Sequence, residues 1–103
     1  MRLVIVTAPI DQAPKLAKTI VEEKLAACAN LMPNIRSIYT WKGKIEDEAE
    51  TLIFFKTTDQ GQQNLTRRIK VLHPYEVPEI ISINIQENEG NLDYLEWVRT
   101  SVC

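Results

Sequence analysis

The stretch that decides how this chain folds reads Leu72-His73-Pro74-Tyr75-Glu76-Val77-Pro78-Glu79-Ile80. It holds the only histidine and two of the five prolines. Pro74 and Pro78 disfavour helical geometry at the residue before each, so the amphipathic run that ends at Leu72 cannot continue past it. We therefore expect a stiff, extended connector that leads from a helix into the apolar strand 80–85. On this interpretation His73 ends the helix, where the helix dipole favours a cation.

The chain on either side of the connector alternates between strand and helix patterns. Residues 3–6 form an aliphatic run typical of a central strand, and Asp11 is placed to cap a helix whose apolar face reaches Leu25. Asp59 is placed to cap the helix that leads to the connector, and Asn91 to cap a short last helix. The order strand, helix, strand, strand, helix, strand predicts an α+β fold, a ferredoxin-like βαββαβ sandwich with an added C-terminal helix.

Two long extended runs, 34–41 and 46–58, predict a β-hairpin with its tip at Lys42-Gly43-Lys44. At ~3.3 Å per residue the second run alone can reach ~40 Å, about twice the length of an ordinary strand. A chain of 103 residues is expected to form one domain, residues 1–103, which is too small to cover such a hairpin. We therefore expect further copies of the chain to bury its apolar side chains.

Composition and charge exclude several classes of protein. The formal net charge of −2 gives no electrostatic footprint for nucleic acid. The apolar N-terminal run is too short for a signal peptide core or a membrane span, so the sequence indicates a cytoplasmic protein. The two cysteines, Cys28 and Cys103, form no C-x-x-C pair. No serine stands in a nucleophile context and no phosphate-binding glycine loop is present, so we expect a protein without catalytic residues.

Three features stand out as candidate binding groups. Lys56 interrupts an apolar strand and shares a face with Phe54 by alternation, which makes it a candidate for contact with an anion or a carboxylate. Cys28 lies among small residues, which is typical of a buried thiol, and with His73 it would also supply the soft ligands that copper prefers. Acidic residues in the hairpin are typical of a solvated strand edge or of a weak cation site: Glu46, Asp47, Glu48 and Glu50.

Four blocks of the sequence resemble the CutA family of divalent-cation tolerance proteins. They are 73–79, 25–30, 37–44 and 56–58, and the resemblance continues in the same order over essentially the whole chain. It implies a ferredoxin-like subunit in a homotrimer whose architecture is similar to that of the PII signalling proteins. It also implies a role in the response to divalent metals, with copper binding proposed, by binding rather than by catalysis.

The resemblance and the residues together leave different kinds of site open. One is a site for copper or another divalent metal with His73 and Cys28 as ligands. Val6 and Leu72 stand where some members assigned as copper binders have a further cysteine and histidine. Another is a cleft between subunits for a small anionic ligand, as in a PII-like signalling or binding module. We expect such a cleft to be lined by Tyr39, Trp41, Lys56, Tyr75 and Glu76. A trimer that binds no ligand remains a purely structural alternative.

Overall fold

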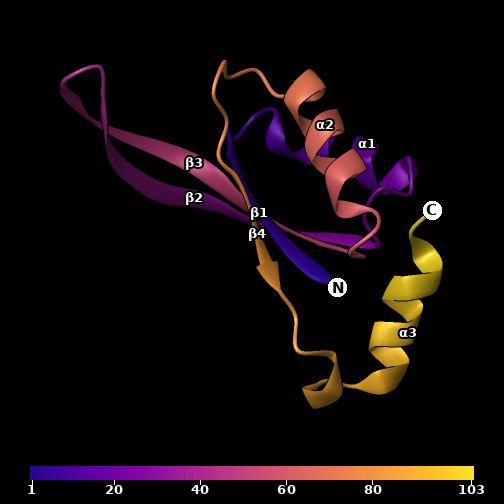
Figure 1. Ribbon diagram of the computed structural model, residues 1–103. Helices are drawn as coiled ribbons and strands as arrows, with labels where there is room; N and C mark the ends of the chain where they lie inside the picture. Colours follow the sequence, from indigo (N-terminus) through magenta and orange to yellow (C-terminus); the bar gives the residue numbers. More distant parts are fainter.

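The computed structural model describes residues 1–103, and its elements follow the predicted order (Figure 1). They are β1 (Arg2–Ala8), α1 (Ala13–Glu22), β2 (Cys28–Trp41), β3 (Lys44–Thr57), α2 (Gln62–Leu72), β4 (Ile80–Asn84), the short 3-10 helix η1 (Glu87–Glu89) and α3 (Leu92–Ser101). The expected α+β fold with an added C-terminal helix is confirmed. The longest helix, α2, has 11 residues, and no helix is both long and apolar enough to cross a membrane.

The four strands form one antiparallel sheet in the order β2-β3-β1-β4. Strand alternation sends Val4 and Val6 of β1 to one face, beside their partners Phe55 and Ile53 of β3. All four side chains are fully buried. They pack in one apolar cluster with residues of α1 and α2, which lie on this face of the sheet (Figure 1). Removing these side chains from water is the main favourable contribution to folding.

Two of the three predicted helix caps are wrong. No side chain caps α1, so Asp11 does not do so. Asp59 accepts hydrogen bonds from the Met1 ammonium (2.7 Å) and the Arg2 guanidinium (3.1 Å) instead of capping α2. Hydrogen bonds from charged donors are stronger than one from a backbone N–H, which explains this choice of partners. Asn91 does cap α3, because its Oδ1 accepts a hydrogen bond from the backbone N–H two residues on (3.1 Å).

The first helix is shorter than its apolar pattern indicated. α1 ends at Glu22, Lys24 adopts a left-handed φ of 59°, and the Leu25 N–H donates to the Ile20 carbonyl (3.2 Å). Leu25 therefore reaches the core from a turn, and Cys28 opens β2. Apolar periodicity reports the face that a side chain reaches, whereas the boundary of the helix depends on local backbone geometry.

The predicted hairpin is formed by β2 and β3, which have 14 residues each. β2 begins earlier than expected because a bulge accommodates Pro33: the register shifts after Met32, and Asn34 has a left-handed φ of 63°. The turn residues Lys42 and Gly43 have φ angles of 51° and 80°. Two successive positive φ angles are typical of the two-residue turn whose twist matches that of the strands.

The outer part of the hairpin extends well beyond the rest of the sheet (Figure 1). β1 pairs only with residues 51–57 of β3, so the remainder of β3 pairs with β2 alone. Ile38 and Ile45 are exposed on this arm. Ile81 and Ile83 of the edge strand β4 are 51% and 49% exposed. They lie on the sheet face opposite to the one that α1 and α2 cover, so the chain leaves apolar surface there for a partner.

Candidate ligand-binding site

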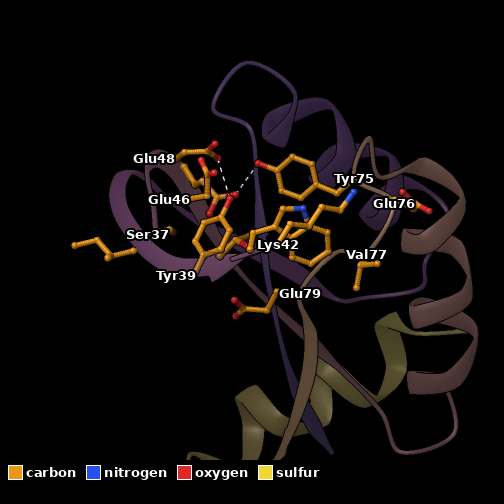
Figure 2. A pocket seen from close by; sticks show the side chains of 13 residues that line it. Ser37, Tyr39, Lys42, Glu46, Glu48, Tyr75, Glu76, Val77 and Glu79 are labelled. Atoms are coloured by element: carbon orange, nitrogen blue, oxygen red, sulfur yellow. Dashed lines mark hydrogen bonds between the residues drawn. The ribbon is translucent and has the colours of Figure 1, made fainter. Parts of the chain in front are cut away.

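A pocket of about 710 Å³ lies where the hairpin meets the connector between α2 and β4 (Figure 2). Because alternate side chains of a strand point to the same face, β3 contributes every second residue, whereas the neighbouring Ser37, Ile38 and Tyr39 of β2 all line the pocket. The two prolines of the connector hold the opposite wall extended. The pocket is lined by Ser37, Tyr39 and Trp41 of β2, by Glu46, Glu48 and Glu50 of β3, and by Tyr75, Glu76, Val77 and Glu79 of the connector, among others.

Four of the five residues proposed for a ligand cleft lie around this one pocket: Tyr39, Trp41, Tyr75 and Glu76. They come together within a single chain, at the junction of the hairpin and the connector. The long strands explain this arrangement, because β2 and β3 run past the end of β1 and form a wall that the connector faces. The chain therefore builds most of the expected aromatic lining on its own.

Lys56, the fifth proposed residue, lies away from the pocket. It pairs with Cys28 on β2 and with Leu3 on β1, roughly 20 Å along β3 from Glu50. Its ammonium donates a hydrogen bond to the Asn30 side chain on the neighbouring strand. Alternation along β3 gives the face of the sheet on which Lys56 lies. It does not show which part of that face the connector covers.

The connector and the hairpin are joined by a hydrogen bond at the pocket wall. The Tyr75 hydroxyl donates to Oε2 of Glu50 (2.7 Å). Burial of the phenol raises the pKa of Tyr75 well above its ordinary value of 10.0, and the Glu50 carboxylate raises it further because a second negative charge beside it is unfavourable. Tyr75 therefore stays a neutral donor, and this contact fixes the distance between the two walls.

A second phenol and carboxylate pair lies on the outer side of the pocket. The Tyr39 hydroxyl donates to Oε2 of Glu48 (3.2 Å) across the two hairpin strands (Figure 2). Partial removal from water and this carboxylate both raise the pKa of Tyr39, although the residue is exposed. The Lys42 ammonium lies 6.0 Å from the centre of the Trp41 ring, within the range of a weak cation–π contact. The pocket thus combines aromatic surfaces with acidic groups.

His73 lies behind the pocket wall and is only 7% exposed. Its Nδ1 accepts a hydrogen bond from the Tyr75 N–H (3.1 Å), so its Nε2 carries the proton and donates to the Thr7 carbonyl (2.7 Å). β4 pairs with β1 only as far as Val6, and the imidazole bonds to the next residue of β1, beyond the end of that ladder. Both ring nitrogens are therefore engaged, and the ring is neutral rather than a cation at the helix end.

The two proposed metal ligands do not lie together. Cys28 is near Leu3 in the sheet, whereas His73 bonds to Thr7, roughly 13 Å farther along β1. The Cys28 thiol instead lies 3.5 Å from the Tyr94 hydroxyl of α3. No three histidine, cysteine, aspartate or glutamate residues are grouped so that they could hold a metal ion. The residues of one chain therefore do not fit a closed copper or zinc site, which needs several converging ligands.

Glu50 is the pocket residue that sequence reasoning undervalued. The acidic run in the hairpin is typical of a solvated strand edge or of a weak cation site, yet Glu50 is only 4% exposed. Its neighbour in the same run, Asp47, fits a solvated strand edge and forms an exposed ion pair with Arg36 (2.7 Å). The available signal was alternation: Glu46, Glu48 and Glu50 share one face of β3, and Asp47 lies on the other.

Comparison with known proteins identifies relatives over nearly the whole chain. A family model described as CutA1 divalent ion tolerance protein matches residues 2–101. The divalent-cation tolerance protein CutA of Thermus thermophilus is 44% identical over 94% of this chain and 93% of its own length. The human protein CutA is 46% identical over 91% of this chain, which corresponds to 52% of the human protein. This chain thus spans about half the length of several relatives, among them a rice protein named as chloroplastic.

Solved structures of proteins with the same family name resemble this chain. The PII-like protein CutA from Nostoc in its apo form superposes with a TM-score of 0.96 at 36% identity and covers 100% of this chain and 98% of its own. The divalent cation tolerance protein of Thermus thermophilus gives a TM-score of 0.93 at 43% identity with full coverage of both chains. By sequence and by fold, the chain belongs to the CutA1 divalent ion tolerance protein family.

Proposed function

We propose that this protein works as a homotrimeric, PII-like binding module that holds a small ligand in the pocket between the hairpin and the connector. The observation that carries this proposal is the convergence of Tyr39, Trp41 and Tyr75 with the buried Glu50 around a volume of about 710 Å³. Pockets of this size with aromatic walls and a few polar groups are typical of small-molecule sites. The family's divalent-cation tolerance would then depend on this binding rather than on a copper site of its own.

The homotrimer draws support from the surface that one chain leaves uncovered. Both edge strands, β2 and β4, offer unpaired backbone groups, and Ile81 and Ile83 expose apolar surface beside one of these edges. A long free edge with apolar neighbours is an aggregation hazard unless a defined partner covers it. A closed assembly of identical chains removes that hazard, and we take the number three from the family resemblance, which implies a PII-like trimer.

Binding without turnover is supported by the groups around the pocket. His73, the only histidine, has both ring nitrogens engaged in hydrogen bonds, so it is not free to act as a general base. Cys28, the thiol that β2 contributes, lies outside the pocket. Copper binding by either ring nitrogen of His73 would displace a hydrogen bond that holds the pocket wall, so direct metal ligation is not the function that the geometry favours.

Native mass spectrometry tests the proposal, because it reports the number of chains and the bound mass together. The protein is sprayed with choline, 3,3-dimethylbutan-1-ol, 3,3-dimethylbutanoate and Cu²⁺ in turn. We expect a trimer that binds at least one organic probe, with the binding lost in Trp41→Ala and kept in Trp97→Ala. Trp97 of α3 is the matched control, since it is 46% exposed and Trp41 is 45% exposed. A monomer, or a trimer that binds none of the organic probes, would refute the proposal.

A further inference from the structure

The charges around the pocket are strongly unbalanced. Lys42 is the only lysine, arginine or histidine among the lining residues. Against it stand five carboxylates, which come from alternate positions of β3 and from the connector: Glu46, Glu48, Glu50, Glu76 and Glu79. Side chains of like charge around one cavity raise its affinity for the opposite charge. The anionic ligand that the sequence suggested depended on Lys56, which lies elsewhere, so the electrostatic argument now favours a cation.

Glu50 is the only one of these five carboxylates that is buried, and none of the five forms an ion pair with a cation of the protein. Glu50 is 4% exposed. Its Oε2 accepts the hydrogen bond from Tyr75, while its Oε1 accepts none from the protein. Every fully buried side-chain oxygen in the protein has a hydrogen-bond partner. Because Oε1 has none, it is not fully buried, and it is reached through the pocket that Glu50 lines. A buried carboxylate is costly without a cation, and the pocket is where one can approach it.

The aromatic walls specify what kind of cation fits. Trp41, Tyr39 and Tyr75 border the same space, and the faces of such rings attract ammonium groups. The protein already shows this preference, because the Lys42 ammonium lies 6.0 Å from the centre of the Trp41 ring. Lys42 follows β2 at the exposed hairpin turn, so its side chain can move away when another ammonium group occupies the ring face.

A bare metal ion is a poorer fit to the same space. No three of the carboxylates converge closely enough to form a metal site. Hard divalent cations take six or more oxygen ligands, or retain water in their place. A volume of about 710 Å³ bordered by rings is instead matched by a ligand with an organic body and one or two positive charges.

We infer that the pocket between the hairpin and the connector binds a small organic cation, an alkylated or primary ammonium compound. Its charged group is held by the Oε1 of Glu50, and its carbon atoms pack against Trp41, Tyr39 and Tyr75. This inference rests on the proposed function and narrows it to one ligand class. Lys42 occupies the outer part of the site in the absence of ligand and competes with it.

Isothermal titration calorimetry with matched probes tests the ligand class. Choline carries a quaternary ammonium, 3,3-dimethylbutan-1-ol is its neutral counterpart of the same shape, and 3,3-dimethylbutanoate is an anion of similar shape. We expect choline to bind about tenfold or more tightly than the neutral alcohol, and the anion not to bind. Mg²⁺ at the same concentration is expected to compete weakly, because it offers charge without an organic body.

Three charge variants test which residue provides the selectivity. Glu50→Gln keeps an acceptor for Tyr75 but removes the charge, so choline affinity is expected to fall about tenfold, toward that of the neutral alcohol. Glu89→Gln, on η1 and outside the pocket, is the matched control and leaves the affinity unchanged. Lys42→Gln raises choline affinity two- to threefold by removing a competitor. If Glu50→Gln does not fold, Lys42→Gln still decides between the two charge preferences, since an anion site would lose affinity in this variant.

The outcomes separate this inference from the function on which it rests. Equal binding of all three organic probes, lost in Trp41→Ala, would overturn the cation preference and leave the pocket as a binding site. Tighter binding of the anion, weakened by Lys42→Gln, would do the same. Binding of none of the probes would overturn both the cation preference and the proposed function.

Discussion

The Tyr75 hydroxyl donates a 2.7 Å hydrogen bond to Oε2 of Glu50, and this contact ties the connector after α2 to the base of the hairpin. The two residues are 25 positions apart in sequence and lie on opposite walls of the pocket. Because Glu50 is buried and has no ion-pair partner, Tyr75 supplies its only hydrogen bond from the protein. The bond therefore contributes both to the stability of the fold and to the shape of the site.

Replacing Tyr75 by phenylalanine should destabilise the protein by about 1–3 kcal/mol, because it leaves a buried carboxylate without its hydrogen bond. The matched control is Tyr39→Phe, which removes the same kind of bond, to Glu48, at an exposed position and should cost less. Urea unfolding at one fixed protein concentration measures both changes, since subunit association also contributes to stability. If both variants lose the same free energy of unfolding, the Tyr75–Glu50 bond contributes no more to stability than the exposed Tyr39–Glu48 bond.

The raised pKa of Tyr75 predicts a loss of stability in alkali. The folded state holds this proton more tightly than the unfolded chain, in which tyrosine titrates near pH ~10. The contribution is therefore fully present below about pH 10 and is lost as the pH rises above it, at up to about 1.4 kcal/mol per pH unit. Urea unfolding between pH 9 and 11 should show a shallower pH dependence in Tyr75→Phe than in the wild type. If the free energy of unfolding depends on pH in the same way in both proteins, the titration of Tyr75 is not the cause of the loss of stability in alkali.

His73 is expected to act as a structural link rather than as a metal ligand. Asparagine at this position can keep the acceptor for the Tyr75 N–H, and glutamine can keep the donor to the Thr7 carbonyl, whereas alanine keeps neither. His73→Ala should cost about 2 kcal/mol or more, and His73→Asn and His73→Gln less than that. Titration of each variant with Cu²⁺ should give the stoichiometry of the wild type. Loss of one copper per chain in all three variants would restore the metal interpretation.

Ile83 should be needed for assembly of the trimer. It is about half exposed on the edge strand β4, on the sheet face that α1 and α2 leave open, and an aspartate there would place a charge in an apolar interface. Ile83→Asp is expected to shift the protein from trimer to monomer in sedimentation velocity experiments. Val71→Asp is the control, because Val71 of α2 is 74% exposed. Identical sedimentation of both variants would mean that this face is not the interface.

The sequence was sufficient to predict the order of the elements, the hairpin and its turn, because these depend on local patterns. The tip was predicted at Lys42-Gly43-Lys44, and the turn is formed by Lys42 and Gly43, while Lys44 already begins β3. Apolar alternation likewise placed Lys56 on the correct face. Helix boundaries were less predictable: Asp59 looked like a cap but found two cations that are distant in sequence.

The residues of the site were predictable only where the local backbone determines the direction in which a side chain points. Tyr39, Trp41, Tyr75 and Glu76 were proposed together and do line one pocket. The burial of Glu50 was missed because it depends on the connector folding back over β3, a contact between segments far apart in sequence. The role of His73 was missed for the same reason, since its partner Thr7 lies 66 residues earlier in the chain.

Ligand binding in the pocket can be observed by ¹⁹F NMR of the protein labelled with 5-fluorotryptophan, because the chain has only two tryptophans. Trp41 borders the pocket and Trp97 lies on α3, so one resonance reports on the site and the other is an internal control. Titration with choline should move the Trp41 resonance in a saturable way and leave that of Trp97 in place. If neither resonance moves with choline, its neutral counterpart or the anionic probe, or if both move alike, the pocket is not the binding site.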